Sequence, residues 1–290
     1  MSATPLTWGG RSIPAPGGLP AVAVSLTGPS LAQARTQAHS AVGAGADVLE
    51  LRVDLLEETG AVAAPEPLDA ATAAAQVLEC LRGLGEIIAA DGADAGAGAP
   101  LLLTCRTAAE GGRARLDDTA YAALLRSVLD GLTDWTPERR PAAIDVEVQR
   151  GCLPQICAQA HALDIDVVAS FHDFEATLAD QVLEEVLARM AREGADLAKI
   201  AVWPTTADDV ARLLGVCARA TAGAGEGADL GVPVAAMSMG ALGAVSRVAP
   251  AFGSALTFAV VPDEQGQSRA SAPGQLPLQD VRRCLELLRA

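Results

Sequence analysis

The sequence predicts a (β/α)8 barrel, and three observations support this fold class. Eight short runs of β-branched and aliphatic residues alternate with eight longer Ala- and Leu-rich segments, the order of a parallel sheet connected by helices. The runs are apolar throughout, as in strands covered on both faces. The 290 residues suit one such barrel, so we expect a single domain over residues 1–290. A doubly wound sheet is the alternative, but no strand leads into a GxGxxG turn and no Walker sequence is present.

The elements can be assigned in order along the chain. The strand candidates are residues 21–26, 48–52, 101–105, 143–148, 167–170, 197–202, 234–237 and 255–260. The helix candidates are residues 30–42, 68–90, 117–132, 153–162, 175–192, 207–220, 241–248 and 278–288. Ser30 and Thr206 stand where they would cap helices, and Gly43, Gly131 and Gly194 fall where helices are expected to end.

Other segments lie outside this alternation. We expect residues 6–13 to form a hairpin that closes the bottom of the barrel. Residues 91–100 and 223–231 each follow a helix and precede a strand, which makes them spacers on the bottom face. Residues 263–275, rich in Gly, Gln and Ser, follow the last strand and are expected to act as a lid.

The composition excludes several classes of function. With 21 Lys and Arg against 36 Asp and Glu, the net charge is −15, which argues against a nucleic-acid or anionic membrane surface. No basic segment followed by an apolar run opens the chain, and Pro and Gly break the longest uncharged stretches. We therefore expect no signal peptide, no membrane span and a cytoplasmic location. The six cysteines form no CxxC pair, as is typical of reduced thiols.

Polar side chains are dense at the carboxyl ends of the predicted strands, the end where barrel enzymes place their sites. They are Glu50, Arg52, Asp54, Thr104, Arg106, Glu110, Asp145, Glu147, Ser170, His172, Lys199, Arg247, Ser271 and Gln275, and the seventh strand ends at Met237 and Met239. No second histidine or cysteine lies at ligand spacing from His172, so we predict no metal site.

Lys199 is the only lysine in the chain, and it lies inside an apolar strand. A guanidinium cannot become a neutral nucleophile, so one lysine among arginines indicates amine chemistry. Apolar walls and neighbouring arginines would raise the neutral fraction of this amine. The sequence therefore favours a Schiff base over the alternative of a structural ion pair.

His172 follows a strand, whereas His39 and His161 fall within predicted helices. A histidine at the barrel mouth is the natural general acid and base, and capping of the following helix is the weaker alternative. Glu110 lies on a glycine-containing loop together with Arg106. It fits two interpretations equally, a carboxylate that orients the imidazole and a surface partner of Arg106.

Taken together, these motifs resemble the type I 3-dehydroquinate dehydratases of the shikimate pathway. The resemblance runs from the first strand to the last helix, and its specificity comes from order and spacing. The segments that carry it are Glu50–Asp54, Arg106 with Glu110–Gly112, Asp145–Val148, Ser170–Asp173, Lys199, Met237–Gly240 with Ser246 and Arg247, Phe252–Ser254 with Thr257 and Phe258, and Ser271–Gln275.

The resemblance implies dehydration of 3-dehydroquinate to 3-dehydroshikimate by a homodimer that needs no cofactor. It implies an imine at Lys199, proton transfer by His172 and pairing of Glu110 with that histidine. Arg247 would bind the substrate carboxylate, with Ser271 and Gln275 closing over it. Glu50, Arg52 and Arg106 would bind the ring hydroxyls, with Ser25 nearby. Met237 and Met239 would form an apolar wall.

One departure and two rival classes stand beside this resemblance. The residue before the catalytic histidine is usually polar in the family, and here it is Phe171. A Schiff-base aldolase on the same barrel would also place a lysine on the sixth strand. An aldolase that acts on sugar phosphates would need a phosphate site after strands seven and eight, whereas this chain has Arg247 and residues 271–275 there, which better suit a carboxylate and hydroxyls. A non-catalytic metabolite sensor would be expected to lack Lys199 or His172, or to carry a DNA-binding domain.

Overall fold

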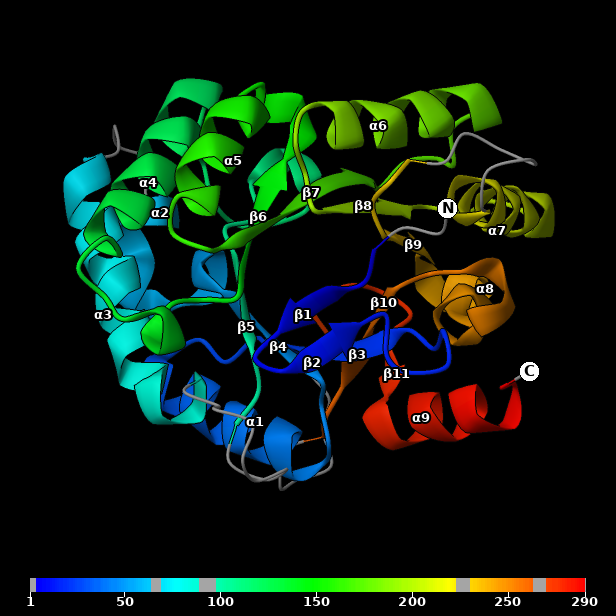
Figure 1. Ribbon diagram of the computed structural model, residues 1–290, viewed down its shortest axis with the longest axis horizontal. Helices are drawn as coiled ribbons and strands as arrows, with labels where there is room; N and C mark the ends of the chain where they lie inside the picture. Colours follow the sequence, from blue (N-terminus) through cyan, green and yellow to red (C-terminus); the bar gives the residue numbers. More distant parts are fainter. Residues whose placement is uncertain (1–3, 64–68, 89–97, 223–229, 263–269, 290) are drawn as a thin grey trace.

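A parallel sheet curled into a barrel forms the centre of the molecule, and helices surround it (Figure 1). The computed structural model describes residues 4–63, 69–88, 98–222, 230–262 and 270–289. Within these residues, nine parallel strands follow the order β11-β10-β3-β4-β5-β6-β7-β8-β9. Strand β10 pairs with β3, and the N–H of Ala255, just before β10, donates to Val234 O of β9 over 2.7 Å. The predicted (β/α)8 barrel is confirmed.

The barrel strands match the predicted runs closely at most positions. They are β3 (Ala21–Leu26), β4 (Val48–Arg52), β5 (Leu101–Thr104), β6 (Ala143–Glu147), β7 (Asp166–Asp173), β8 (Leu197–Val202), β9 (Val234–Ser238) and β10 (Leu256–Val260), with β11 (Leu276–Pro277) as a short addition. Apart from Asp166, His172 and Asp173 of β7 and the two residues of β11, the strand residues are buried, as expected for a parallel sheet covered on both faces.

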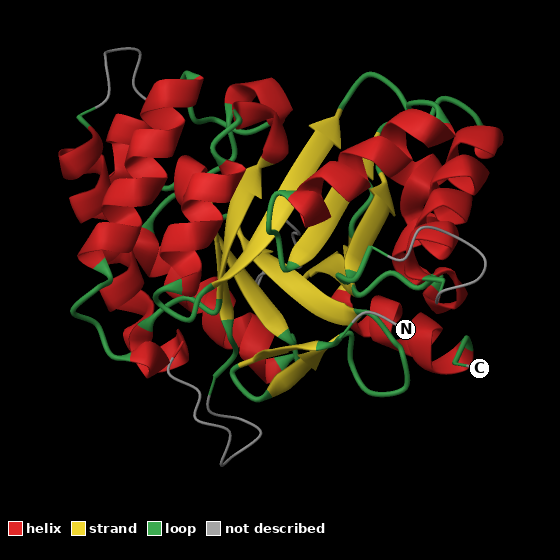
Figure 2. Cartoon of the chain, turned by 45° about the horizontal axis from the view of Figure 1, so that its top comes forward, coloured by secondary structure: helices red, strands yellow, loops and turns green. Residues whose placement is uncertain are grey.

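The helices pack around the outside of the sheet (Figure 2). They are α1 (Leu31–Gly43), α2 (Gly60–Ala63), α3 (Ala70–Ile88), α4 (Asp118–Gly131), α5 (Leu153–His161), α6 (Asp180–Arg192), α7 (Ala207–Thr221), α8 (Gly240–Gly243) and α9 (Leu278–Leu287). The Ser30 side chain accepts from Gln33 N, and Thr206 forms a capping box with Asp209, so both predicted caps are confirmed.

Two predicted helices were wrong in extent. Residues 175–192 were expected to be helical throughout, but α6 begins at Asp180 because β7 continues to Asp173. The Asp173 carboxylate accepts from the amides of Glu175 and Ala176, which fixes a turn there. Residues 241–248 divide into α8 and a 3-10 helix, η6 (Ala244–Val248), where the Ser246 hydroxyl bonds Gly243 O and Ser238 N in competition with regular helix bonds.

The predicted hairpin at the barrel bottom is confirmed. Strands β1 (Leu6–Trp8) and β2 (Arg11–Ile13) pair antiparallel and cross the barrel end (Figure 1). Trp8 and Ile13 are buried against the inward residues of the barrel strands, among them Val48 and Leu197. The Trp8 indole N–H donates to Asp166 at the start of β7 over 2.7 Å. The hairpin therefore fills one end of the barrel and leaves the other for a site.

Much of the predicted spacers and of the lid lies outside the described residues, which omit 89–97, 223–229 and 263–269. Residues 270–275 are described and lie at the top of the barrel. No helix within the described ranges is both long enough and apolar enough to cross a membrane.

Candidate active site

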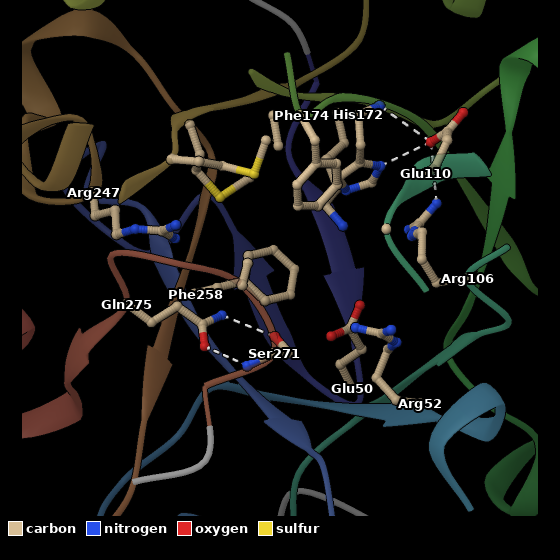
Figure 3. Close-up of a pocket in the computed structure, with 16 residues that line it drawn as sticks. Glu50, Arg52, Arg106, Glu110, His172, Phe174, Arg247, Phe258, Ser271 and Gln275 are labelled. Atoms are coloured by element: carbon tan, nitrogen blue, oxygen red, sulfur yellow. Dashed lines mark hydrogen bonds and ion pairs between the residues drawn. The ribbon is translucent and has the colours of Figure 1, made fainter. Parts of the chain in front are cut away.

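A pocket opens at the carboxyl ends of the barrel strands and encloses about 480 Å³, part of it open to solvent (Figure 3). Every predicted site residue except Ser25 lines it. The lining residues are Glu50, Arg52, Arg106, Glu110, Gly111, His172, Phe174, Lys199, Ala201, Met237, Met239, Arg247, Phe258, Ser271, Ala272 and Gln275. The fold thus brings together groups that lie more than 200 residues apart in the sequence.

Lys199 extends from β8 into this pocket and is 5% exposed. Its Nζ lies 3.5 Å from Asp145 Oδ2 and 4.7 Å from the centre of the Phe258 ring. Burial lowers the pKa of Lys199, and Arg106 and Arg52 add to this, whereas Asp145 and Glu50 oppose it. The site therefore increases the neutral fraction of the amine while keeping a carboxylate beside it.

His172 and Glu110 form a hydrogen-bonded pair on the opposite side of the pocket from Arg247 (Figure 3). Glu110 Oε2 lies 2.9 Å from His172 Nδ1 and accepts from His172 N over 3.1 Å. Because this oxygen already accepts from a backbone amide, we assign the ring proton to Nδ1, which leaves Nε2 as the basic nitrogen. The interpretation of Glu110 as an orienting carboxylate is supported over that of a surface pair.

The electrostatics of this pair favour uncharged forms. Burial, followed by the charges of Arg106, Lys199 and Arg52, holds the pKa of His172 well below its ordinary value. Burial also raises the pKa of Glu110, although Arg106 opposes it. A neutral imidazole is the form that a general base requires.

The turn that carries Glu110 depends on glycine. Gly111 has φ 82°, and the Phe174 ring lies where a β-carbon at Gly111 would be. The turn is a 3-10 helix, η3 (Ala108–Glu110), directly after β5. The Glu-Gly-Gly motif therefore lets this loop approach the end of β7 closely.

Arg106 is the centre of a buried carboxylate cluster. Its Nη2 donates to Asp145 over 2.8 Å, and its Nη1 to Ser170 over 2.8 Å and Glu147 over 3.2 Å. The same Nη1 lies 3.5 Å from Glu110 Oε2. Both terminal nitrogens of Arg106 contact protein oxygens. Arg106 therefore influences the pocket mainly by positioning the side chains that it contacts, namely Asp145, Glu147, Ser170 and Glu110.

Glu50 and Arg52 come from β4 and lie side by side (Figure 3). The Glu50 carboxylate accepts from the hydroxyls of Ser25 and Thr104, the latter over 3.0 Å. Arg52 forms a two-point pair with Asp54, with distances of 2.8 and 2.7 Å. Ser25 therefore lies behind the lining and supports Glu50.

Arg247 differs from the other basic groups because no carboxylate within the described residues pairs with it. It is 2% exposed, its Nη2 donates to Pro273 O over 3.1 Å, and its Nε has no partner in that part of the chain. Burial lowers the pKa of Arg247 to about 10. An unpaired buried cation in a pocket is a site for an anion.

Ser271 and Gln275 lie beside Arg247 on the segment after β10 (Figure 3). The two residues exchange hydrogen bonds of 2.9 and 3.0 Å, and Ser271 Oγ also donates to Ser25 Oγ over 2.8 Å. Their polar groups face the pocket together with the guanidinium of Arg247.

The apolar side of the pocket is larger than predicted. Met237 of β9 and Met239, just after that strand, lie in the lining as predicted, but Phe258, Phe174 and Ala201 line it as well. Phe174 stands two positions after His172, so strand alternation could have indicated it. Phe258 is one of the residues that carry the family resemblance, but the apolar run of β10 does not itself indicate which of its residues face the site.

Residues 22–290 match the family model described as Type I 3-dehydroquinase. The chain belongs to this family. The 3-dehydroquinate dehydratase of Lactiplantibacillus plantarum is 38% identical over 276 residues, 93% of either chain, and that of Klebsiella pneumoniae is 35% identical over 271 residues, 92% of either chain.

Solved structures agree with this membership. The 3-dehydroquinate dehydratase of Geobacillus kaustophilus has a TM-score of 0.79 and 27% identity, with 99% of this chain and 97% of that chain covered. The type I enzyme of Clostridium difficile, solved with covalently modified comenic acid, has a TM-score of 0.78 and 26% identity, with coverage of 99% and 98%. As a type I 3-dehydroquinase the chain is a hydro-lyase, which confirms the predicted enzyme class.

Proposed function

We propose that this chain dehydrates 3-dehydroquinate to 3-dehydroshikimate through an imine at Lys199. One observation carries the proposal: a buried amine shares its pocket with an imidazole that is hydrogen-bonded to a carboxyl group and with a buried guanidinium that lacks a carboxylate partner among the described residues. The three groups match the ketone, the acidic C–H bond and the carboxylate of this substrate.

The first step forms the imine. The neutral amine of Lys199 attacks the ring ketone, and the resulting carbinolamine takes up a proton and loses water to give an iminium ion between the lysine and the substrate. Asp145, whose pKa Arg106 and Lys199 lower despite burial, stays ionised beside Nζ and stabilises the cation. The iminium withdraws electrons from the neighbouring carbon, which makes its C–H bond acidic.

The second step transfers protons through His172. Its Nε2 takes the proton from the carbon next to the iminium, and the electron pair moves into an enamine. The protonated imidazole then gives its proton to the departing hydroxyl, which leaves as water while the carbon–carbon double bond forms. Hydrolysis of the conjugated iminium uses one water, releases the enone and the proton taken up in the first step, and restores Lys199, so the net change is loss of one water.

The remaining residues orient the substrate. Arg247 binds the carboxylate, and Ser271 and Gln275 close over it. Glu50 and Arg52 bind the ring hydroxyls, because both side chains line the pocket. A hydrogen bond from Ser25 holds Glu50 in place, and a hydrogen bond to Asp54 holds Arg52. Arg106 contributes from the same side by holding the Glu110 carboxylate near His172.

Reductive trapping tests this proposal. Protein mixed with 3-dehydroquinate and borohydride should gain the mass of a reduced adduct, and peptide mapping should find it at Lys199. Ultraviolet absorbance should report formation of the conjugated enone, and EDTA should leave the rate unchanged. An intact mass that does not change under reduction during turnover would remove the imine, and absence of enone would remove the activity.

We also propose that residues 1–290 act as one domain, that the enzyme is a homodimer, and that it works in the cytoplasm. The buried thiols of Cys80, Cys105, Cys152, Cys157 and Cys217 support a reducing compartment, because all are unpaired and burial raises their pKa values. Sedimentation equilibrium would test the dimer, and a single cooperative unfolding transition would test the single domain.

A further inference from the structure

Arg150 lies behind the active site and contacts three separate elements. It ends the 3-10 turn η5 (Val148–Arg150) that follows β6, and its side chain is 13% exposed. Its Nε donates to Glu147 over 3.0 Å, its Nη2 to Thr107 Oγ1 over 2.7 Å and its Nη1 to Asp118 over 2.9 Å. A guanidinium with a partner on each nitrogen is fixed in position.

Glu147 connects this arginine to the active-site cluster. It is fully buried, and its two oxygens accept four hydrogen bonds. Oε1 accepts from Thr107 N and Arg106 Nη1, and Oε2 accepts from Thr107 Oγ1 and Arg150 Nε. One carboxylate thus lies between two arginines, and without Arg150 it would have Arg106 as its only close cation among the described residues.

Thr107 connects the same arginine to the turn that carries Glu110. Its carbonyl oxygen accepts from Glu110 N over 3.0 Å and from Gly112 N over 2.8 Å. Its side chain is held between Glu147 and Arg150. The position of η3, and hence of the Glu110 carboxylate, therefore depends on contacts made by Arg150.

Arg106 divides its Nη1 among Glu147, Ser170 and Glu110, and Glu110 at 3.5 Å is the most distant of the three. Loss of Arg150 would strengthen the attraction between Glu147 and Arg106. Arg106 would then move from Glu110, which in turn accepts from His172. We propose that Arg150 is a positioning residue, which acts through Glu147 and Thr107 to hold Arg106 and Glu110 in register with His172.

This inference rests on the proposed dehydration, and it predicts a change in pH dependence. The charged groups that act on the His172–Glu110 pair are Arg52, Arg106, Asp145, Glu147, Arg150 and Lys199, and Glu50 lines the same pocket. Arg150 is among the cations that lower the pKa of Glu110. Removal of that charge raises the proton affinity of the pair, so the acid limb of kcat/KM should move to higher pH by about 0.5 to 1 unit.

The experiment compares Arg150→Gln with the wild type in pH–rate profiles of kcat and KM. On the acid side of the limb, kcat/KM should fall about three- to tenfold, which is the shift of 0.5 to 1 unit expressed as a rate. At high pH the two enzymes should converge, and KM should stay within twofold. Arg150→Lys keeps the charge and should return the limb to near the wild-type position.

Two matched variants complete the test. Arg192→Gln removes an arginine that pairs with Glu185 at the surface, where both side chains are at least 60% exposed, and it should leave the profile unchanged. Asp118→Asn removes the outer partner of Arg150, which is 64% exposed, and at low salt it should move the limb slightly to lower pH. This variant tests the sign even if Arg150→Gln does not fold.

The outcomes separate this inference from the proposed function. A folded Arg150→Gln enzyme whose profile superimposes on the wild type, or falls equally at every pH, overturns the role of Arg150. So does an Asp118→Asn limb that stays in place or moves upward. A wild type without turnover overturns the dehydration instead, and NMR titration of the His172 ring in Arg150→Gln then still measures whether its protonation has moved.

Discussion

Replacing Arg247 with glutamine should weaken substrate binding and stabilise the free protein at the same time. Arg247 is 2% exposed, and no carboxylate in the described part of the chain balances its charge. Glutamine can still donate to Pro273 O but carries no charge. The same change therefore removes the proposed partner of the substrate carboxylate and an unfavourable buried cation.

The two magnitudes follow from the structure. A buried charge-assisted contact to a carboxylate contributes about 3 kcal/mol, so kcat/KM should fall roughly 150-fold, mostly through KM. Burial lowers the pKa of Arg247 to about 10, and at about 1.4 kcal/mol per pKa unit the buried cation costs the folded state about 3 kcal/mol. The unfolded chain binds the guanidinium proton more tightly than the folded chain does. Since pH 7 lies below both pKa values, the full destabilisation of about 3 kcal/mol is present at that pH.

The assay combines steady-state kinetics with urea unfolding at pH 7. Arg247→Gln should show a raised KM together with a higher urea midpoint of unfolding. The gain in stability will be reduced by the packing contacts that the shorter glutamine side chain loses. Arg247→Lys keeps a charge without the planar fork and should fall between the two enzymes in KM. Arg192→Gln serves as the surface control. A KM within threefold of the wild type would refute the assignment of Arg247 as the carboxylate partner, and a large fall in stability would refute the argument that its buried charge destabilises the free protein.

Three further predictions concern other parts of the molecule. Lys199→Met should lose all measurable turnover and gain no mass under borohydride; a reduced adduct elsewhere in this variant would show that another amine reacts. His172→Ala should lower kcat by about 10²- to 10⁴-fold yet still form a trappable imine, and turnover near the wild-type rate would contradict its acid/base role. Trp8→Ala should lower the free energy of unfolding by about 3 to 5 kcal/mol, because the ring is 1% exposed within the barrel end, and an unchanged urea midpoint would show that the hairpin does not close the core.

Much of the fold could be predicted because parallel strands leave a strong local pattern. Strands β3, β4 and β8 begin and end at the predicted residues, since each is an uninterrupted buried run. The start of α6 could not be predicted in this way. Asp173 stops the helical pattern by binding two backbone amides with its side chain, and composition alone does not reveal that turn.

The site could be predicted where a residue type was unusual in its surroundings. Lys199 stood out as a lysine in an apolar strand, and His172 as a histidine after one. That Arg106 contacts the ring hydroxyls stays a prediction. Sequence spacing could not show its pairing with Asp145 and Glu147, which lie 39 and 41 residues away. Arg150 was missed because an arginine after a strand is common; its spacing of three from Glu147 was the available signal.

The pairing of charges in the pocket explains how an acidic protein would select an anion. Arg52 is matched by Asp54, Arg106 by Asp145 and Glu147, and Lys199 by Asp145, so these cations attract little from solution. Arg247 alone among the lining cations has no carboxylate within the described residues. The net charge of −15 repels anions from the surface, whereas this single unbalanced cation makes one position in the pocket favourable. A substrate whose carboxylate binds Arg247 places its ketone at a fixed distance from that carboxylate, and this distance must match the separation of Arg247 and Lys199. A compound that lacks the carboxylate should therefore lose orientation as well as affinity.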